Sequence, residues 1–156
     1  MIITNDLIKT ALSLIELTAR EILLSEGTTW GPRWVEGFIS APGVSGAIPF
    51  KFGKVTEWNN EWGKRRFTSS EIALKKLNLA ERFGDDTSSI IEACPWVLEE
   101  GEFLYAGGIS RFGINVGVSG AKGRVDEAIA NLLVDCIIML AHLETDARIA
   151  RHEMQI

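Results

Sequence analysis

The chain has 156 residues and a formal net charge of −5, with 46% hydrophobic and 24% charged residues. A chain of this length forms one domain by default and buries roughly two thirds of its surface, so it needs no metal ion or disulfide for stability. The negative charge argues against a general nucleic-acid-binding protein. We therefore expect one domain over residues 1–156, with no nucleic acid among its partners.

The cysteines and the N-terminus bear on the compartment of the protein. The chain has two cysteines, Cys94 and Cys136, and two buried thiols in a reducing compartment are commoner than one disulfide. No basic segment precedes an apolar run at the N-terminus, so we expect no signal peptide. We expect no apolar run that approaches the roughly 18 residues of a membrane span. These features predict a cytoplasmic protein without a membrane partner.

The first predicted element is an amphipathic helix over residues 5–26. Its apolar side chains recur at helical spacing, Asn5 or Asp6 can cap its start, and Gly27 can stop it. Its mixed charges favour a helix that packs on its own domain over one that lies on a membrane surface.

Residues 28–63 are rich in glycine, proline and tryptophan, which is typical of strands and turns. We expect strands over residues 34–40 and 47–51, a turn between them, and a continuation of the second strand over residues 54–58. Tryptophans can line a ligand pocket, bury a subunit interface or cap the edge of a thin sheet, and these alternatives stay open. The tryptophans of this region are Trp30, Trp34, Trp58 and Trp62.

Two helices follow. A capping-box pattern from Thr68 to Glu71 predicts the start of a helix that ends at Gly84. A shorter helix should run from Asp86 to about Cys94, where Pro95 ends it.

The last third of the chain begins with a turn over residues 99–102 and a strand over residues 103–106. Residues 109–119 form another strand or a broken pair, because Ile114, Val116 and Val118 alternate with small or polar residues. A long helix should cover residues 123–153. Its middle is apolar nearly all round, which predicts burial on more than one side and favours a homo-oligomer.

The order of the elements predicts the fold class. Strands in adjacent pairs, with helices before, between and after them, indicate an α+β domain in which helices cover an antiparallel sheet.

The turn Ser119-Gly-Ala-Lys-Gly-Arg124 is one candidate ligand site. Backbone N–H groups at a helix start can hold an anion, and Lys122 and Arg124 would add positive charge. Gly120 lies at the sharp reversal, and Gly107 and Gly108 permit close approach of a ligand or a neighbouring element. A tight crossover turn without any ligand explains the same residues, so both interpretations stay open.

The basic run Lys64-Arg65-Arg66 is a second candidate. With the walls of Trp58 and Trp62 just before it, this run suits a flat or apolar ligand that carries a carboxylate. Lys75, Lys76 and Arg82 continue the basic character, and a solvated helix face that pairs with Glu71 and Glu81 is the competing interpretation.

Other chemistry has less support in the sequence. His142 and Asp146 share a helix face, but two ligands alone do not define a metal site, so we expect none. We find no Ser-His-Asp arrangement and no cysteine nucleophile motif.

Three motifs together resemble a known family. Gly107-Gly108, Gly117-Val-Ser-Gly-Ala121 and Asp126-Glu127-Ala128 are similar to the C-terminal half of the GlcG/HbpS haem-binding-protein family and its PduO C-terminal relatives. Residues 60–66, with Asn78 and Arg82-Phe83, resemble the related haem-degrading-domain proteins. The resemblance covers about residues 60–135.

The resemblance implies a profilin-like α+β fold in homo-oligomers that bind haem, a corrinoid or another small molecule. Neither His142 nor His152 lies in a motif of the family, so we assign neither as a haem ligand. We expect a small-molecule binding module that acts as a carrier, sensor or accessory protein. The alternative is an enzyme that acts on a small anionic metabolite at a subunit interface, held by Arg65, Arg66 and the turn at 119–124.

Overall fold

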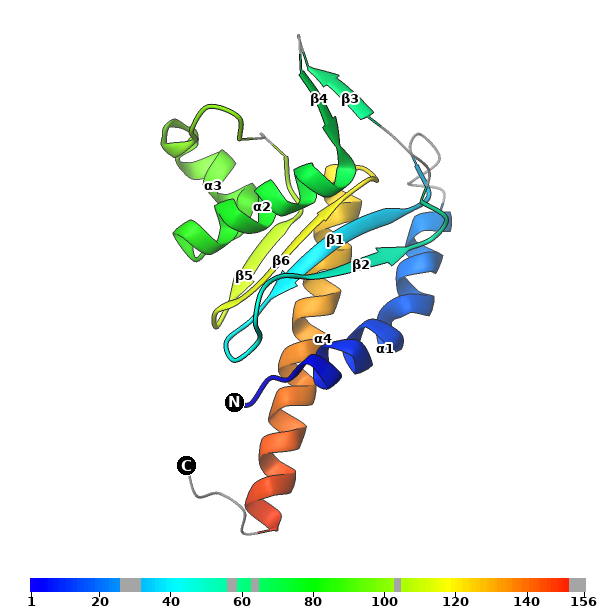
Figure 1. Ribbon diagram of the computed structural model, residues 1–156, viewed down its shortest axis with the longest axis vertical. Helices are drawn as coiled ribbons and strands as arrows, with labels where there is room; N and C mark the ends of the chain where they lie inside the picture. The colour runs from blue at the N-terminus through cyan, green and yellow to red at the C-terminus, as the bar shows by residue number, and fades with distance from the viewer. Residues whose placement is uncertain (26–31, 56–58, 63–64, 103–104, 152–156) are drawn as a thin grey trace.

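The computed structural model describes residues 1–25, 32–55, 59–62, 65–102 and 105–151, and for residues 59–62, 65 and 66 it describes the backbone alone. The chain forms an α+β fold in which helices flank a four-stranded antiparallel sheet, as expected from the order of its elements (Figure 1).

The described elements alternate between helices and pairs of strands. The helices are α1 (Asn5–Leu24), α2 (Ser69–Phe83), α3 (Thr87–Ala93), the short 3-10 helix η2 (Pro95–Val97) and α4 (Gly123–Ala150). The strands are β1 (Val35–Ser40), β2 (Ile48–Phe52), β3 (Asn59–Trp62), β4 (Arg65–Thr68), β5 (Gly108–Arg111) and β6 (Ile114–Ser119). The sheet has the order β2-β1-β6-β5, and β3 and β4 pair as a separate hairpin.

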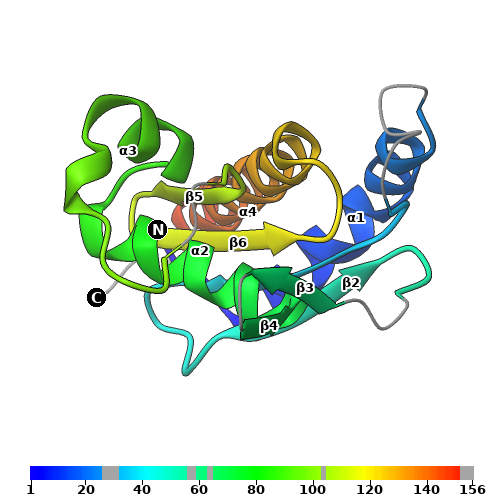
Figure 2. The ribbon, with the colours of Figure 1, turned by 90° about the horizontal axis from the view of Figure 1, so that it is seen from above.

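The sheet separates two helical layers. Helix α2 packs on β1, β5 and β6 from one side, whereas α4 covers β5 and β6 from the other side and α1 packs beside α4 (Figures 1 and 2). The main apolar core lies between the sheet and the layer of α1 and α4. It includes Ile8, Leu23, Ile39, Val116, Leu133 and Ile137, each less than 2% exposed.

The two faces of the sheet differ in character because side chains alternate along β6. Ile114, Val116 and Val118 belong to the apolar core, whereas Gly117 lies under α2. A side chain at Gly117 would overlap the Ala73 carbonyl oxygen of α2. The helix therefore packs directly on the backbone of the sheet, which only glycine permits.

The predicted helix ends are mostly confirmed. Thr68 caps α2, because its hydroxyl accepts a hydrogen bond from the Glu71 N–H at 3.1 Å, and Gly84 ends the helix with a φ of 63°. The start of α1 is a correction. Thr4, rather than Asn5 or Asp6, is the cap, because its hydroxyl accepts from the Leu7 N–H at 3.1 Å. The expected stop at Gly27 lies outside the described residues.

The strand predictions are confirmed in β1, β2 and the β5–β6 pair. Lys54 and Val55 are not in a strand, contrary to expectation, and residues 56–58 lie outside the described part. Tyr105 and Ala106 are likewise outside any strand, and residues 103 and 104 are not described. The hairpin of β3 and β4 was missed, because its sequence Asn-Asn-Glu-Trp and Arg-Arg-Phe-Thr has no clean apolar alternation.

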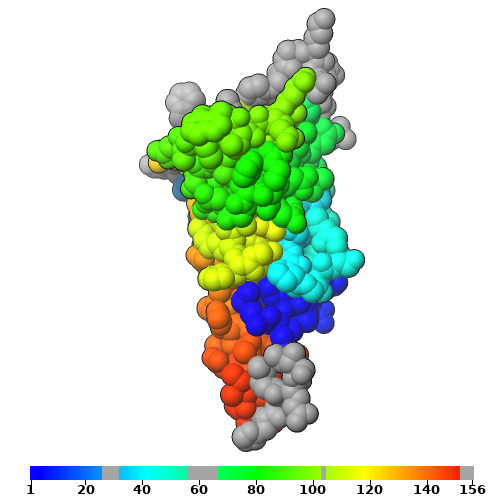
Figure 3. Space-filling view, turned by 90° about the vertical axis from the view of Figure 1, so that its left-hand side faces the viewer, coloured from blue at the N-terminus to red at the C-terminus, as the bar shows by residue number. Residues whose placement is uncertain are grey.

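Helix α4 is the longest element, and its last turns extend beyond the sheet and the helices around it (Figures 1 and 3). An 18-residue window of this helix has a mean hydropathy of 1.6, so by length and composition it could span a membrane. The expectation that no apolar run approaches that length was therefore wrong. A core helix of a soluble protein has the same composition, and here the inner face of α4 packs on the sheet.

The contact between α2 and the sheet generates the first prediction. Gly117→Ala should destabilise the fold by about 3 kcal/mol, because the new methyl group must push α2 away from β6. Chemical denaturation measures the effect. Gly123→Ala is the matched control, because a Cβ there meets its nearest atoms at an ordinary 3.7 Å. Equal midpoints for the two variants would show that α2 does not pack this closely.

Candidate functional site

The turn between β6 and α4 forms one wall of a cleft of about 230 Å³. Helix α2 contributes the opposite wall, and the segment before β5 closes one side. The lining residues are Ile72, Lys76, Tyr105, residues 119–123 and Asp126. Three segments that are distant in sequence therefore meet at this point.

A buried ion pair lies at the bottom of the cleft. The Lys76 Nζ lies 3.0 Å from the Asp126 Oδ2, and each side chain is 3% exposed. The same Nζ donates to the Val118 carbonyl oxygen at 2.8 Å, and the other carboxylate oxygen of Asp126 accepts from the Ala121 N–H at 3.1 Å. The pair thus connects α2, the end of β6, the turn and the start of α4.

Local sequence explains how each partner reaches this place. Lys76 lies on the inner side of α2, three residues after the buried Ala73 and four before the buried Ala80, so it shares their face of the helix. Asp126 lies in the first turn of α4, where the positive end of the helix dipole favours a carboxylate. Lys122, which precedes the helix, makes no side-chain capping hydrogen bond. The Asp126 carboxylate instead accepts a hydrogen bond from the Ala121 N–H of the turn.

The environment changes the protonation of Asp126. Burial raises its pKa to about 6, although Lys76 and the Ala121 N–H both act in the opposite direction. An unperturbed aspartate titrates near 3.9, so this carboxyl exchanges its proton much closer to neutral pH. Shifted carboxyls in clefts are candidates for functional sites.

Two glycines make room for the ion pair and the turn. Gly107 has a φ of 122°, and a side chain there would meet the Lys76 Nζ at 2.9 Å. Gly120 has a φ of 135°, and a side chain there would meet the Trp34 carbonyl oxygen at 2.7 Å. Both positions combine left-handed backbone with close packing, so glycine is required.

The structure brings three of the predicted site residues together and leaves two others aside. Gly120 and Lys122 line the cleft, and Gly107 lies against the ion pair. Gly108 instead packs under α2, where its N–H donates to the Thr87 hydroxyl at 3.0 Å. Arg124 is exposed and does not line the cleft, so its role in ligand binding stays a prediction.

The other predicted ligand residues cannot be placed at a site. Trp58 lies outside the described residues. Trp62 and Arg65 pair across the β3–β4 hairpin, and Arg66 pairs with Glu61, but only the backbone is described there.

The ion pair between Lys76 and Asp126 was not predicted from the sequence. Lys76 was counted with a solvated basic face, although its spacing from the apolar residues of α2 signalled an inward position. Arg82, from the same predicted face, pairs with Glu102 at 2.8 Å and with Glu99 at 3.3 Å, rather than with Glu71 or Glu81.

A haem does not fit the cleft as the described residues form it. Its volume is below the roughly 300 Å³ at which sites for drug-sized ligands begin. No histidine, cysteine or methionine lines it. Burial raises the pKa of Tyr105 above its ordinary value, which disfavours the phenolate that would bind iron.

A metal site or a disulfide has no more support than haem among the described residues. His142 is exposed on α4, and His152 lies outside the described part of the chain. No three His, Cys, Asp or Glu side chains converge on a metal position among the described residues. Cys94 and Cys136 are free thiols and are half-buried rather than fully buried.

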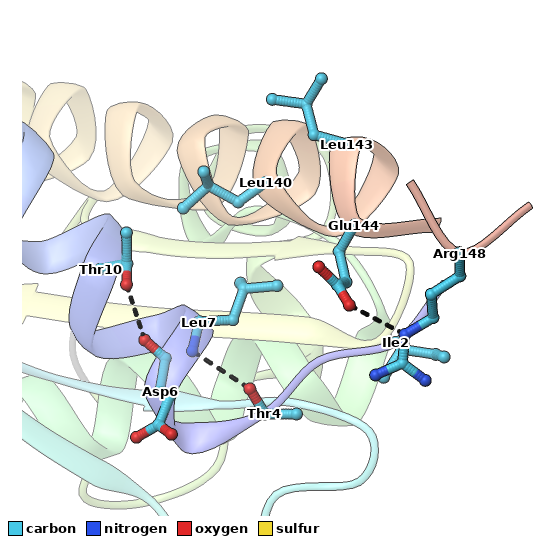
Figure 4. A pocket seen from close by; sticks show the side chains of 9 residues that line it. All are labelled: Ile2, Thr4, Asp6, Leu7, Thr10, Leu140, Leu143, Glu144 and Arg148. Carbon is cyan, nitrogen blue, oxygen red and sulfur yellow. Dashed lines mark hydrogen bonds and ion pairs between the residues drawn. The ribbon is translucent and has the colours of Figure 1, made fainter. Parts of the chain in front are cut away.

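Two larger hollows lie elsewhere. One, of about 470 Å³, lies between α1 and α4, and its lining includes Leu7, Leu140 and the Glu144–Arg148 ion pair of 2.9 Å (Figure 4). The other, of about 500 Å³, lies beside α2 on the side of Leu74 and Leu77. Neither is lined by a buried charged side chain, so we place the candidate site at the smaller cleft.

Comparisons with known proteins leave the family open. No family model matches the chain, and no curated protein or solved structure matches it either. The resemblance to the GlcG/HbpS family therefore stays a prediction, and the functional argument depends on the geometry of the cleft.

The ion pair generates the second prediction. Lys76→Met should destabilise the fold by about 3–5 kcal/mol, because it leaves the buried Asp126 without its partner. The double variant Lys76→Met with Asp126→Leu should recover most of that loss, because no buried charge remains. Denaturation of both variants and of the wild type at pH 7 measures the difference. A double variant no more stable than the single variant would contradict this account.

Proposed function

We propose that the chain is a small-molecule binding module whose ligand is a small carboxylate or related anion held in the cleft at residues 119–124. The observation that carries this proposal is the buried ammonium of Lys76 in a cleft at the start of α4. Carrier, sensor and accessory roles all fit such a module.

The electrostatics of the cleft favour a negative ligand. The charges of Lys76 and Asp126 compensate each other, and the basic residue Lys122 lies at the rim of the cleft. The start of α4 contributes the positive end of a helix dipole and N–H groups that have no partner within the helix. This local balance differs from the net charge of −5 of the whole chain.

The size of the cleft restricts the ligand class. A volume of about 230 Å³ suits a molecule of a few non-hydrogen atoms, such as a short-chain carboxylate. The haem or corrinoid that the family resemblance implies would need further walls beyond this cleft. The absorbance spectrum of freshly purified protein tests for such a tetrapyrrole.

One observation favours an enzyme as the second candidate. Asp126 has a pKa of about 6 and lies 3.0 Å from an ammonium group, which is a suitable pair for proton transfer near neutral pH. Such an enzyme would act on the same small anions. Exchange of the methyl protons of pyruvate in D2O, followed by NMR, distinguishes it from a binding module.

We also propose that the chain forms a homo-oligomer through the outer face of α4. Met139, Leu143 and Ile149 of this helix are 49%, 58% and 54% exposed. Met139 and Leu143 are one turn apart, and exposed apolar side chains at that spacing are typical of a surface that another element covers. A second copy offers the same surface and can bury both at once.

The third prediction concerns the ligand. Lys122→Ala should weaken binding of a small carboxylate by about 1 kcal/mol, the scale of a partly exposed charge interaction. Calorimetric titration with acetate, lactate, pyruvate, oxalate and inorganic phosphate measures the affinities. Arg124→Ala is the matched control, because it removes the same charge from the same helix start without touching the cleft. Equal losses in both variants would indicate general electrostatics rather than a site.

The fourth prediction concerns assembly. Sedimentation at micromolar concentration should show a species larger than the 17.2 kDa monomer. Leu143→Glu should shift it toward the monomer, because a carboxylate on the apolar face opposes burial. Leu74→Glu on α2, in the opposite layer, should leave the assembly unchanged. A wild type that sediments as a clean monomer would overturn the proposal.

A further inference from the structure

We infer that the cleft takes up its anion together with a proton, which Asp126 accepts, so that the site binds the equivalent of a small carboxylic acid. This inference rests on the proposed function, since it describes how the same cleft accommodates its ligand.

The geometry around Lys76 motivates the inference. Its ammonium has three N–H donors, and two of them are directed to the Val118 carbonyl oxygen at 2.8 Å and to Asp126 at 3.0 Å. One donor is left for a ligand. A carboxylate that accepts from this donor shares the ammonium with the Asp126 carboxylate.

Two carboxylates beside one buried ammonium are unfavourable. The ligand would add a negative charge to a pair that is already neutral, in a place where each side chain is 3% exposed. Like charges at such a distance strongly favour protonation of one of them. Asp126 is the partner that burial already drives toward the protonated form.

Among the charged and titratable groups around the cleft, Asp126 is the one that can accept the proton. Helix α2 contributes Lys76, and the turn contributes Lys122, both of which are cations. The segment before β5 contributes Tyr105, whose raised pKa keeps it neutral. From β6 come only a backbone carbonyl and Ser119, and Glu127, the next acidic residue of α4, does not line the cleft.

Protonation also improves the contacts of the bound state. A protonated Asp126 keeps an oxygen that accepts from the Ala121 N–H, and its new O–H can donate to the ligand. Lys76 is then available to the ligand as the only buried charge of the site. The buried part of the bound cleft therefore contains one cation and one anion, as it does without the ligand.

The pH dependence of the affinity follows from the protonation of Asp126 in the protein without ligand. Below about pH 6 Asp126 already carries the proton in the free protein, so the affinity is nearly independent of pH. Above that pH the proton must come from solution, and the affinity for a strong-acid ligand falls about tenfold per pH unit. A site that binds the anion without a proton would not show this decrease of affinity with pH.

Calorimetric titration of the wild type with pyruvate and with oxalate tests the inference. At pH 7.5 the binding heat should vary with the ionisation enthalpy of the buffer and indicate uptake of about one proton. At pH 5.0 the same comparison should indicate uptake near zero. This measurement uses the unaltered chain, so it does not depend on the folding of any variant.

Two variants localise the proton. Asp126→Asn mimics the protonated carboxyl, so at pH 7.5 it should bind pyruvate about as tightly as the wild type does at pH 5.0, without proton uptake. Glu127→Gln is the matched control, because it removes the neighbouring carboxylate outside the cleft and should leave the uptake unchanged. Binding without proton uptake would overturn this inference alone. Absence of binding at both pH values would overturn the proposed function and this inference with it.

Discussion

The ion pair between Lys76 and Asp126 connects α2, the end of β6 and the start of α4. It holds α2 against the end of β6 and fixes the turn that starts α4. Both charges are removed from water, which is costly unless each finds its partners. The lysine donates to two acceptors and the carboxylate accepts at both oxygens, so these hydrogen bonds offset part of the loss of hydration.

The ion pair depends in turn on the unequal faces of the sheet. One face is apolar and carries the main core with α1 and α4. The other face presents Gly108 and Gly117 to α2, which brings the helix backbone into direct contact with the strands. This short distance allows the Lys76 side chain to reach across to the start of α4. The cleft lies between α2 and the turn that precedes α4.

A site of this kind links stability to ligand binding. A buried carboxyl with a pKa of about 6 is less favourable at neutral pH than a solvated one, and the fold tolerates it at the point where a small anion would bind. In the proposed binding, the positive start of α4 and Lys122 would direct such an anion toward the cleft. The structural role of the ion pair and its proposed role in binding therefore use the same atoms.

The sequence by itself determined the elements whose signals are local. The Thr68 cap, the stop at Gly84 and the alternation along β6 depend on residues a few positions apart, and all of them are present in the structure. The fold class followed from the order of these elements. The turn at 119–124 also emerged as a candidate, because its glycines precede a helix start.

Only the tertiary structure decided which residues meet in the cleft. Lys76 and Asp126 are 50 residues apart in the chain, and no local pattern pairs them. Charge alone favours a solvated position for Lys76 on α2. The side chain is buried because this helix packs closely on the glycines of the sheet. Lys122 lines the cleft whereas Arg124, two residues further on, does not, and the sequence alone did not distinguish them. Local patterns specify helices and turns, whereas the electrostatics of a buried pair depend on the distance between elements, which exists only in the folded chain.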